Sequence, residues 1–114
     1  MLTPEVAWAA GLFEGEGCID DSGRNSIRIT LSMCDEDSVW RFARAVGRPE
    51  VHFKFAPGMK RREQKPQYLV RASGHDAVDI LTILWEGLGQ RRRARALELL
   101  SKAHIRRPRR YKEV

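Results

Sequence analysis

The sequence has few of the residues that mark secreted or zinc-stabilised domains. Its 114 residues include two cysteines, Cys18 and Cys34, and three histidines. Two cysteines are too few for a disulfide framework, and they favour a reducing, cytoplasmic setting such as a bacterial, phage or organellar interior. Because the cysteines and histidines lack C-x-x-C or H-x-x-x-H spacing, we do not expect a structural zinc site.

Long apolar runs are also missing. No run approaches the roughly 20 residues that a membrane span needs, and residues 1–5 lack the basic and apolar regions of a signal peptide. The composition, 42% apolar and 32% charged, is that of a folded globular chain. We therefore expect no membrane partner and no secretion, with one domain over residues 1–104 and a basic C-terminal tail over residues 105–114.

Positive charge is concentrated in the second half of the chain. Residues 1–50 hold five basic and nine acidic side chains, whereas residues 51–114 hold 16 basic and six acidic ones. The basic residues cluster at 60–62, 91–95 and 106–110. Such clusters bind phosphates by releasing counterions, so nucleic acid is the expected partner, although any single cluster could be a solvated surface.

Apolar periodicity and turn residues predict an α+β fold in the order α-β-β-α-β-β-α-α. We expect helices over residues 4–14, 35–46, 74–86 and 90–104, with Leu97 and Leu100 facing inward in the last of them. We expect strands over residues 18–20, 26–33, 51–55 and 67–72. The predicted architecture is a four-stranded antiparallel sheet with helices on one face and polar side chains on the other.

The polar face of this sheet is the first candidate binding surface. Arginine and glutamine can contact base edges, and lysine and arginine can hold phosphates, although many sheets simply present a solvated polar face. The DNA-binding residues that we expect, on this face and in the basic segments, are Arg24, Arg28, Thr30, Ser32, His52, Lys54, Lys60, Arg61, Arg62, Gln67, Arg71 and Arg92.

The first helix has an unusual stripe of small residues. Gly11 lies inside the helix, where glycine costs about 1 kcal/mol relative to alanine. Ala7, Gly11 and Gly15 are spaced by four residues, so a second backbone could approach this side closely. The stripe favours a helix–helix contact between two subunits, and close packing within one chain is the alternative. The interface residues that we expect are Ala7, Trp8, Ala10, Gly11, Glu14 and Gly15.

Two acids, Glu14 and Glu16, stand where this helix ends. A helix C-terminus already carries partial negative charge, so carboxylates there are unfavourable unless a cation is near. Hard divalent cations take carboxylate and carbonyl oxygens, which Glu16 and Gly15 could both supply. The E-x-E-G spacing alone is weak evidence for a metal site, because acidic residues are common in turns. We interpret Glu14 as a cap or interface residue rather than a metal ligand.

In its full context the segment is more specific. Residues 9–17, AAGLFEGEG, resemble the motif of the LAGLIDADG homing endonucleases. In small members of that family the motif often has the form AGLFDGEG. The resemblance extends over roughly residues 5–100 and includes the order of elements. It implies that the sheet is a DNA-binding saddle and that the motif helices pack together at the centre.

The resemblance also implies roles for individual residues. The last acid of the motif matches Glu16, which would bind Mg²⁺ beside the scissile phosphate, with the Gly15 carbonyl as a second ligand. The basic residue after the third helix matches Arg91 by its spacing from Leu88, with Arg92 as the alternative. Three positions depart from the common pattern: Glu16 replaces aspartate, Met33 stands where glutamine is frequent, and arginine stands where lysine is frequent.

One motif provides one essential acid, whereas a duplex has two strands. The resemblance therefore predicts a homodimer that makes a double-strand cut at a long, near-palindromic DNA site, as intron- or intein-borne endonucleases do. A DNA-binding regulator that has lost cleavage, and an RNA maturase that assists intron splicing, are the alternatives. Retention of Glu16 argues against the regulator.

Overall fold

The computed structural model describes residues 2–23, 26–48, 50–54 and 66–102. Its elements are α1 (Pro4–Glu16), β1 (Gly17–Asp21), β2 (Ile27–Met33), α2 (Glu36–Ala45), β3 (His52–Lys54), β4 (Gln67–Ser73), α3 (Gly74–Leu84), the short 3₁₀ helix η2 (Trp85–Gly87) and α4 (Gln90–Lys102). The predicted α+β class and element order are confirmed. The predicted tail, residues 105–114, lies outside the described residues.

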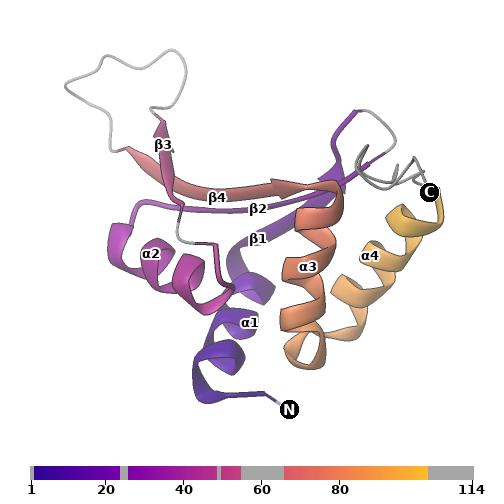
Figure 1. Cartoon of the computed structure of the whole chain (residues 1–114), viewed down its shortest axis with the longest axis horizontal. Coiled ribbons are helices and arrows are strands. Elements are labelled where there is room, and N and C mark those ends of the chain that lie inside the picture. The colour runs from indigo at the N-terminus through magenta and orange to yellow at the C-terminus, as the bar shows by residue number, and fades with distance from the viewer. Residues whose placement is uncertain (1, 24–25, 49, 55–65, 103–114) are drawn as a thin grey trace, which may run out of the picture.

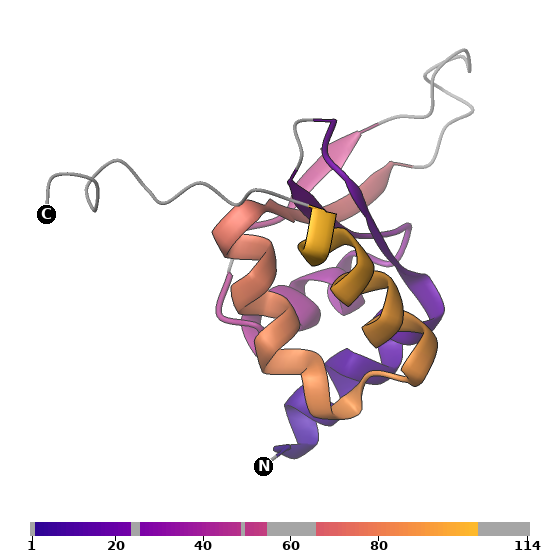
Figure 2. The ribbon, with the colours of Figure 1, turned by 90° about the vertical axis from the view of Figure 1, so that its right-hand side faces the viewer.

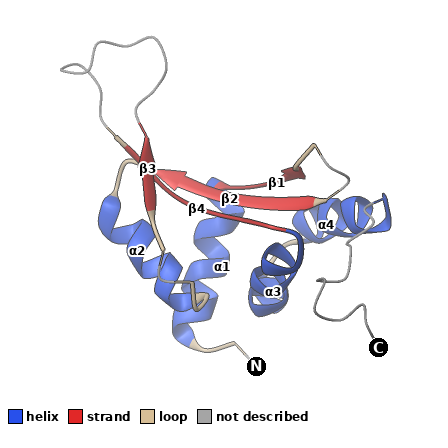
Figure 3. Cartoon of the chain, turned by 45° about the horizontal axis from the view of Figure 1, so that its top comes forward, coloured by secondary structure: helices blue, strands red, loops and turns tan. Residues whose placement is uncertain are grey.

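The strands form an antiparallel sheet of four strands in the order β1-β2-β4-β3. Figure 1 shows the helices beneath this sheet, while no helix of the described residues lies on the upper face. Figure 3 shows the same one-sided arrangement from a tilted view. A sheet covered on one face by helices must bury apolar side chains on that face, and strand β2 meets this need by alternation.

Strand β2 alternates as the sequence predicts. Ile27, Ile29 and Leu31 are fully buried, and the residues between them are half-buried on the opposite face. From strand β4, Val70 lies opposite Leu31 and is 2% exposed. On the helix side, the Phe13 and Phe42 rings stack with centroids 6.1 Å apart, which joins α1 to α2 beneath the sheet.

Helix α1 begins as expected and ends later than expected. The Thr3 hydroxyl caps it by accepting a hydrogen bond from the Val6 amide at 3.1 Å. The sequence predicted an end near Glu14, but the helix continues to Glu16. The two additional residues are held because the Gly17 amide donates to the Phe13 carbonyl and Arg92 donates to the Glu14 carbonyl. These bonds offset the poor helix propensity of Gly15.

One prediction about side-chain direction, that Leu97 faces inward, is wrong, whereas Leu100 is half-buried and packs against the core. Leu97 is 56% exposed, because Ala96 and Leu99 form the buried side of α4. Strand β3 is shorter than predicted and its residues are all exposed, with Phe53 at 64% exposure at the edge of the sheet, where its ring lies beside Tyr68. An edge strand has a neighbour on one side only, so alternation there does not guarantee burial.

Helices α3 and α4 lie side by side on the helical side of the sheet (Figure 2). The turn between them approaches α1 closely, because a Cβ atom added to Gly87 would lie 2.5 Å from the Ala10 Cβ atom. Only a glycine fits at this crossing without displacement. None of the helices in the described residues is both long and apolar enough to cross a membrane.

Candidate active site and nucleic-acid interface

The motif places Glu16 at the junction of α1 and β1. Glu16 is the last residue of α1 and is exposed, and Gly17 pairs with Leu31 at the start of β1. Within the described part of the chain, the Glu16 carboxylate makes no hydrogen bond or ion pair. The neighbouring Gly15 carbonyl belongs to the last helical turn, whose carbonyls have no partner within the helix. Carboxylate and carbonyl oxygens are therefore presented together at this end.

Glu14 connects α1 to α4. Its Oε1 atom accepts a hydrogen bond from the Gly89 amide at 2.5 Å, just before α4 begins. Its backbone carbonyl accepts a hydrogen bond from Arg92 Nη2 at 3.1 Å. Of the two interpretations of Glu14, cap or interface residue, this contact agrees with a cap. The side chain caps the start of α4, however, and not the end of its own helix.

Arg92 is the basic residue that the fold brings to the end of the motif helix. Besides its bond to Glu14, its guanidinium carbon lies 5.7 Å from the centroid of the Phe13 ring. Its Nε atom is buried without a hydrogen-bond partner in the described structure. Arg91 is exposed, and it makes no hydrogen bond, ion pair or ring contact within the described residues. The position of Arg92 at the end of α1 therefore favours it as the basic residue beside Glu16, whereas spacing in the sequence favoured Arg91.

The register of the strands places the predicted sheet-face residues in rows. Thr30 lies opposite Cys18 on one side and opposite Arg71 on the other. Ser32 lies opposite Leu69, which in turn lies opposite His52, and Gln67 lies opposite Lys54. All seven of the predicted sheet-face residues are on strands β2, β3 and β4: Arg28, Thr30, Ser32, His52, Lys54, Gln67 and Arg71.

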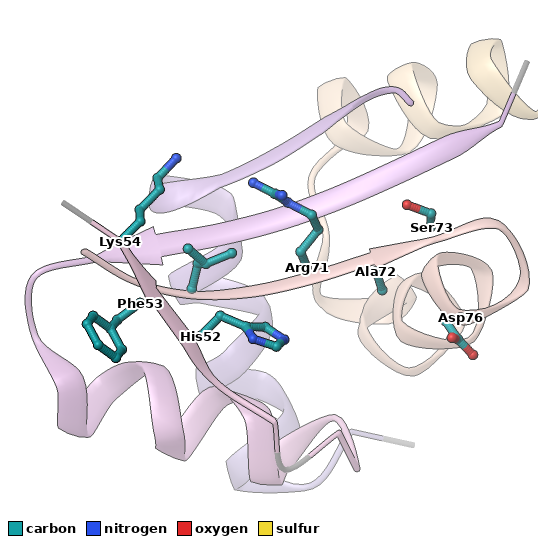
Figure 4. Close-up of a pocket in the computed structure, with 8 residues that line it drawn as sticks. His52, Phe53, Lys54, Arg71, Ala72, Ser73 and Asp76 are labelled. Atoms are coloured by element: carbon teal, nitrogen blue, oxygen red, sulfur yellow. The ribbon is translucent and has the colours of Figure 1, made fainter. Parts of the chain in front are cut away.

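An open hollow of about 600 Å³ beside strands β3 and β4 is lined in part by His52, Lys54 and Arg71, and also by the carboxylate of Asp76. Figure 4 shows Lys54 and Arg71 on the same side of the sheet, with Phe53 pointing the other way, toward α2. Leu69 also lines the hollow and is 5% exposed, so an apolar floor lies between polar walls. Lys54 and Arg71 are the charged groups of this surface that can bind a polyanion.

Two polar networks order the side chains of this face. Ser32 Oγ and Gln67 Oε1 are 3.0 Å apart, and Gln67 Nε2 lies 3.0 Å from Cys34 Sγ. At the other end, Arg28 donates to Asp20 through Nε and Nη2, at 3.0 Å to Oδ1 and 2.9 Å to Oδ2. These hydrogen bonds hold the pKa of the Asp20 carboxyl below its ordinary value of 3.8 and raise the pKa of Arg28.

The small-residue side of α1 is exposed. Ala7, Gly11 and Gly15 are all exposed, and a Cβ atom added to Gly11 or Gly15 would meet nothing within 4 Å. Close packing within one chain, the alternative explanation, is therefore not supported for these two glycines. Ala10 is different: its side chain is fully buried and faces Gly87, so it belongs to the core of the single chain and we remove it from the predicted interface.

Trp8 is half-buried. It packs against the core, and Arg41 lies over its ring at 3.9 Å from the ring centroid. It therefore remains partly accessible at the edge of the exposed stripe.

Sequence reasoning missed one polar residue of the sheet face and could not place others. Asp20 was assigned only to a short strand, because its position opposite Arg28 depends on the length of the turn between β1 and β2. The spacing between Asp20 and Arg28 in the sequence does not by itself indicate that they pair. The remaining predicted DNA contacts, Arg24, Lys60, Arg61 and Arg62, lie outside the described residues.

Comparison with known proteins gives one structural relationship. No protein-family model matches the sequence, and no curated protein matches it. Among solved structures, the chain is similar to the crystal structure of the homing endonuclease I-CvuI in complex with its target in the presence of calcium ions. The sequences are 18% identical, and the TM-score is 0.57. The chain has the fold of a homing endonuclease.

The similarity covers 84% of this chain and 64% of the I-CvuI chain, so this chain spans less than two thirds of the length of that structure. The homing-endonuclease fold confirms the fold class that the motif resemblance implied. Within the described residues, no three His, Cys, Asp or Glu side chains form a group that could hold a metal ion.

Proposed function

We propose that the chain is a Mg²⁺-dependent DNA endonuclease that cuts both strands of a long, near-palindromic site as a homodimer. The observation that supports this most directly is the placement of Glu16. Its exposed carboxylate stands at the end of the motif helix, where α1 meets the first strand of the sheet with the bare polar face. A DNA strand lying on that sheet would bring its phosphates toward this carboxylate.

The sheet is the proposed DNA-binding surface. Its uncovered face combines cations that can hold phosphates with hydroxyl and amide groups that can bond to base edges. A twisted antiparallel sheet can enter the major groove, which presents a different donor and acceptor pattern for each base pair. Because Arg71 and Lys54 point to the same side, they would contact the duplex together (Figure 4).

Glu16 and the Gly15 carbonyl are the proposed metal ligands. The fit rests on the donor set: an exposed carboxylate and a last-turn carbonyl are hard oxygen ligands of the type that Mg²⁺ takes. When bound, Mg²⁺ stabilises developing charge on a phosphoryl oxygen and lowers the pKa of bound water. Phosphate oxygens and water would complete the ligand set, since one chain provides a single carboxylate here.

Arg92 is the proposed cation beside the cleaved phosphate, and Arg91 a contact to a neighbouring phosphate. Arg92 is already held at the end of α1 through the Glu14 carbonyl, so its charge is positioned before DNA binds. Arginine stays protonated near neutral pH, so it would stabilise charge and would not transfer protons. The proton acceptor would therefore be water or another group.

The homodimer is proposed from the exposed side of α1. Residues 6–13 of α1 carry no polar side chain, and such a stretch is normally buried on all sides, yet Ala7 and Gly11 within it, and Gly15 beyond it, are exposed in the single chain. A second copy of α1, related by a two-fold axis, would cover this stripe and bring a second Glu16 to the opposite DNA strand. Trp8 would border the contact, whereas Glu14 would act mainly through α4.

A cleavage selection on a randomised duplex library tests the proposal. With Mg²⁺, the protein should release cut ends that define one near-palindromic consensus, and Glu16→Gln should reduce cutting on the order of a hundredfold or more, because it removes the charged ligand. Glu14→Gln is the matched control: it makes the same chemical change two residues away, its amide oxygen can still accept from Gly89, and cutting should persist.

The outcomes separate the alternatives. Undiminished cutting by Glu16→Gln removes Glu16 from the mechanism. Specific duplex binding with no cutting by the parent protein favours a DNA-binding regulator of the same fold. Preferential binding of structured intron RNA over duplex DNA favours a maturase.

A further inference from the structure

The ion pair between Asp20 and Arg28 is unexpected on the uncovered face of the sheet, which we propose as the DNA-binding surface. An acid on such a surface repels phosphates, so its presence needs an explanation. Asp20 lies directly opposite Arg28 in the β1–β2 register, on the uncovered face. The two side chains are 37% and 32% exposed, so they remain accessible to a ligand from solvent.

The geometry of the pair restricts Arg28. Its Nε and Nη2 atoms each donate to a different oxygen of Asp20, at 3.0 and 2.9 Å, so the guanidinium plane is fixed by two parallel bonds. A guanidinium has five N–H donors, and these bonds occupy two of them. The donors that remain lie at the outer end of the group, on Nη1 and Nη2.

From this arrangement we propose that Asp20 is a positioning residue for DNA specificity, which orients Arg28 so that the outer edge of its guanidinium contacts a guanine. This proposal rests on the proposed DNA-binding function. Bidentate arginine contacts to guanine O6 and N7 need two N–H groups at a defined angle. With Asp20 holding the inner edge, the outer edge is presented in one orientation, and less rotamer freedom is lost on binding.

A structural role alone is the competing explanation. Cross-strand ion pairs on sheet surfaces contribute modestly to stability, and this pair could simply support the β1–β2 pairing. The two roles differ in what they affect. A structural pair changes the stability of the free protein, whereas a positioning pair changes the preference for one base at one position of each half-site.

The test is a binding selection from a randomised duplex library, carried out without Mg²⁺ so that cleavage is not required. The parent protein, Asp20→Asn, Arg28→Ala and Asp20→Glu are compared position by position. We expect Arg28→Ala to abolish a guanine preference at one symmetrical pair of positions, and Asp20→Asn to weaken the same preference about tenfold. Asp20→Glu keeps both acceptor oxygens and should retain part of the preference.

Asp79→Asn is the matched control. Asp79 accepts from Arg48 at 3.1 Å on the helical side, so the substitution makes the same chemical change and the same change in net charge away from the sheet face. Its base-preference profile should equal that of the parent. Thermal unfolding of all variants shows whether each is folded, and if Asp20→Asn is unfolded, the comparison of Asp20→Glu with the parent decides the question.

Each outcome has one meaning. A profile for Asp20→Asn that equals the parent's, while Arg28→Ala loses a guanine preference, overturns the role of Asp20 and leaves the proposed function intact. An unchanged profile for Arg28→Ala also overturns the inference alone. A parent protein that binds no duplex, or binds without sequence preference, overturns the inference together with the DNA-recognition part of the proposed function.

Discussion

The two faces of the sheet are made by alternate residues of the same strands, but they differ in almost every physical property. In β2, Ile29 is fully buried against the helices, while its neighbours Arg28 and Thr30 are half-buried on the uncovered face. In β4, Val70 is buried and Arg71 is exposed. The helical side therefore holds the apolar core, and the other side holds cations, hydroxyls, an amide and the Asp20 carboxylate.

This difference indicates that stability and recognition are encoded separately along one strand. Removing apolar area from the core reduces the free energy of unfolding, since that area and its packing contacts are lost. Changes on the uncovered face alter charge and hydrogen bonding with little loss of buried area. Substitutions at adjacent positions should therefore affect different measurements.

The largest expected effect is on the core side. Ile29→Ala should reduce the free energy of unfolding by about 2–5 kcal/mol, because it removes buried methyl groups and leaves a cavity between β2 and the helices. The adjacent Thr30→Ala, on the uncovered face, should change it by about 1 kcal/mol or less. Urea denaturation followed by circular dichroism measures both. Equal losses for the two variants would contradict the separation of the faces.

Helix α1 extends the comparison, because it has a buried side and an exposed apolar side. Gly11→Leu should leave the single chain folded, since nothing lies within 4 Å of the added Cβ atom, and leucine is the better helix former. In a dimer, however, leucine would separate the two helices, so we expect the dimer dissociation constant to rise by about tenfold or more.

Sedimentation equilibrium measures this change. Ala94→Leu, at an exposed position of α4, is the control for added apolar surface and should leave the dimer unchanged. A Gly11→Leu variant that sediments as the parent dimer would place the subunit contact elsewhere.

Local patterns predicted the central parts of this architecture, while non-local contacts decided what they missed. The strict alternation of residues 27–33 fixed both faces of β2, because a side-chain period of two has one outcome when one face is buried. The sequence predicted that the first helix ends near Glu14, just before Glu16. The helix instead continues to Glu16, and one of the bonds that hold its end comes from Arg92, which is distant in sequence.

The same reasoning explains the other differences. Arg92 rather than Arg91 reaches α1 because the rotation of α4 is set by packing of Ala96 and Leu99, which also leaves Leu97 exposed. Asp20 was missed as a partner of Arg28 because strand register depends on the turn between β1 and β2. Spacing in the sequence could not provide either of these relationships.

A smaller effect is expected for single cations on the uncovered face. Arg71→Ala should weaken duplex binding less than tenfold at moderate salt and reduce the slope of log K against log salt by about one per chain, because one phosphate contact is lost. Arg44→Ala, an exposed cation of α2 on the helical side, is the control and should leave the slope unchanged. Fluorescence anisotropy over a salt series measures both, and equal slopes for the parent and Arg71→Ala would argue against this face as the DNA contact.

The smallest expected effect compares two bidentate ion pairs, one on each side of the sheet. Arg41 donates to both carboxylate oxygens of Glu5 on the helical side, as Arg28 does to Asp20 on the uncovered face, and each arginine lowers the pKa of its partner carboxyl. A carboxyl with a lowered pKa in the folded state stabilises the protein above its ordinary pKa, and this stabilisation is lost as the pH falls through the folded-state value.

Glu5→Gln and Asp20→Asn should therefore each destabilise the free protein slightly at pH 7. The difference from the parent should shrink below about pH 4.5 for Glu5 and below about pH 3.8 for Asp20, their ordinary pKa values. Urea denaturation between pH 7 and pH 3 at low salt measures this, since salt screens exposed pairs. A difference that persists unchanged at pH 3 would mean that the variants act through packing rather than charge. If the pairs match in stability but only Asp20→Asn alters base preference, the same ion-pair geometry has a structural role on one face and a recognition role on the other.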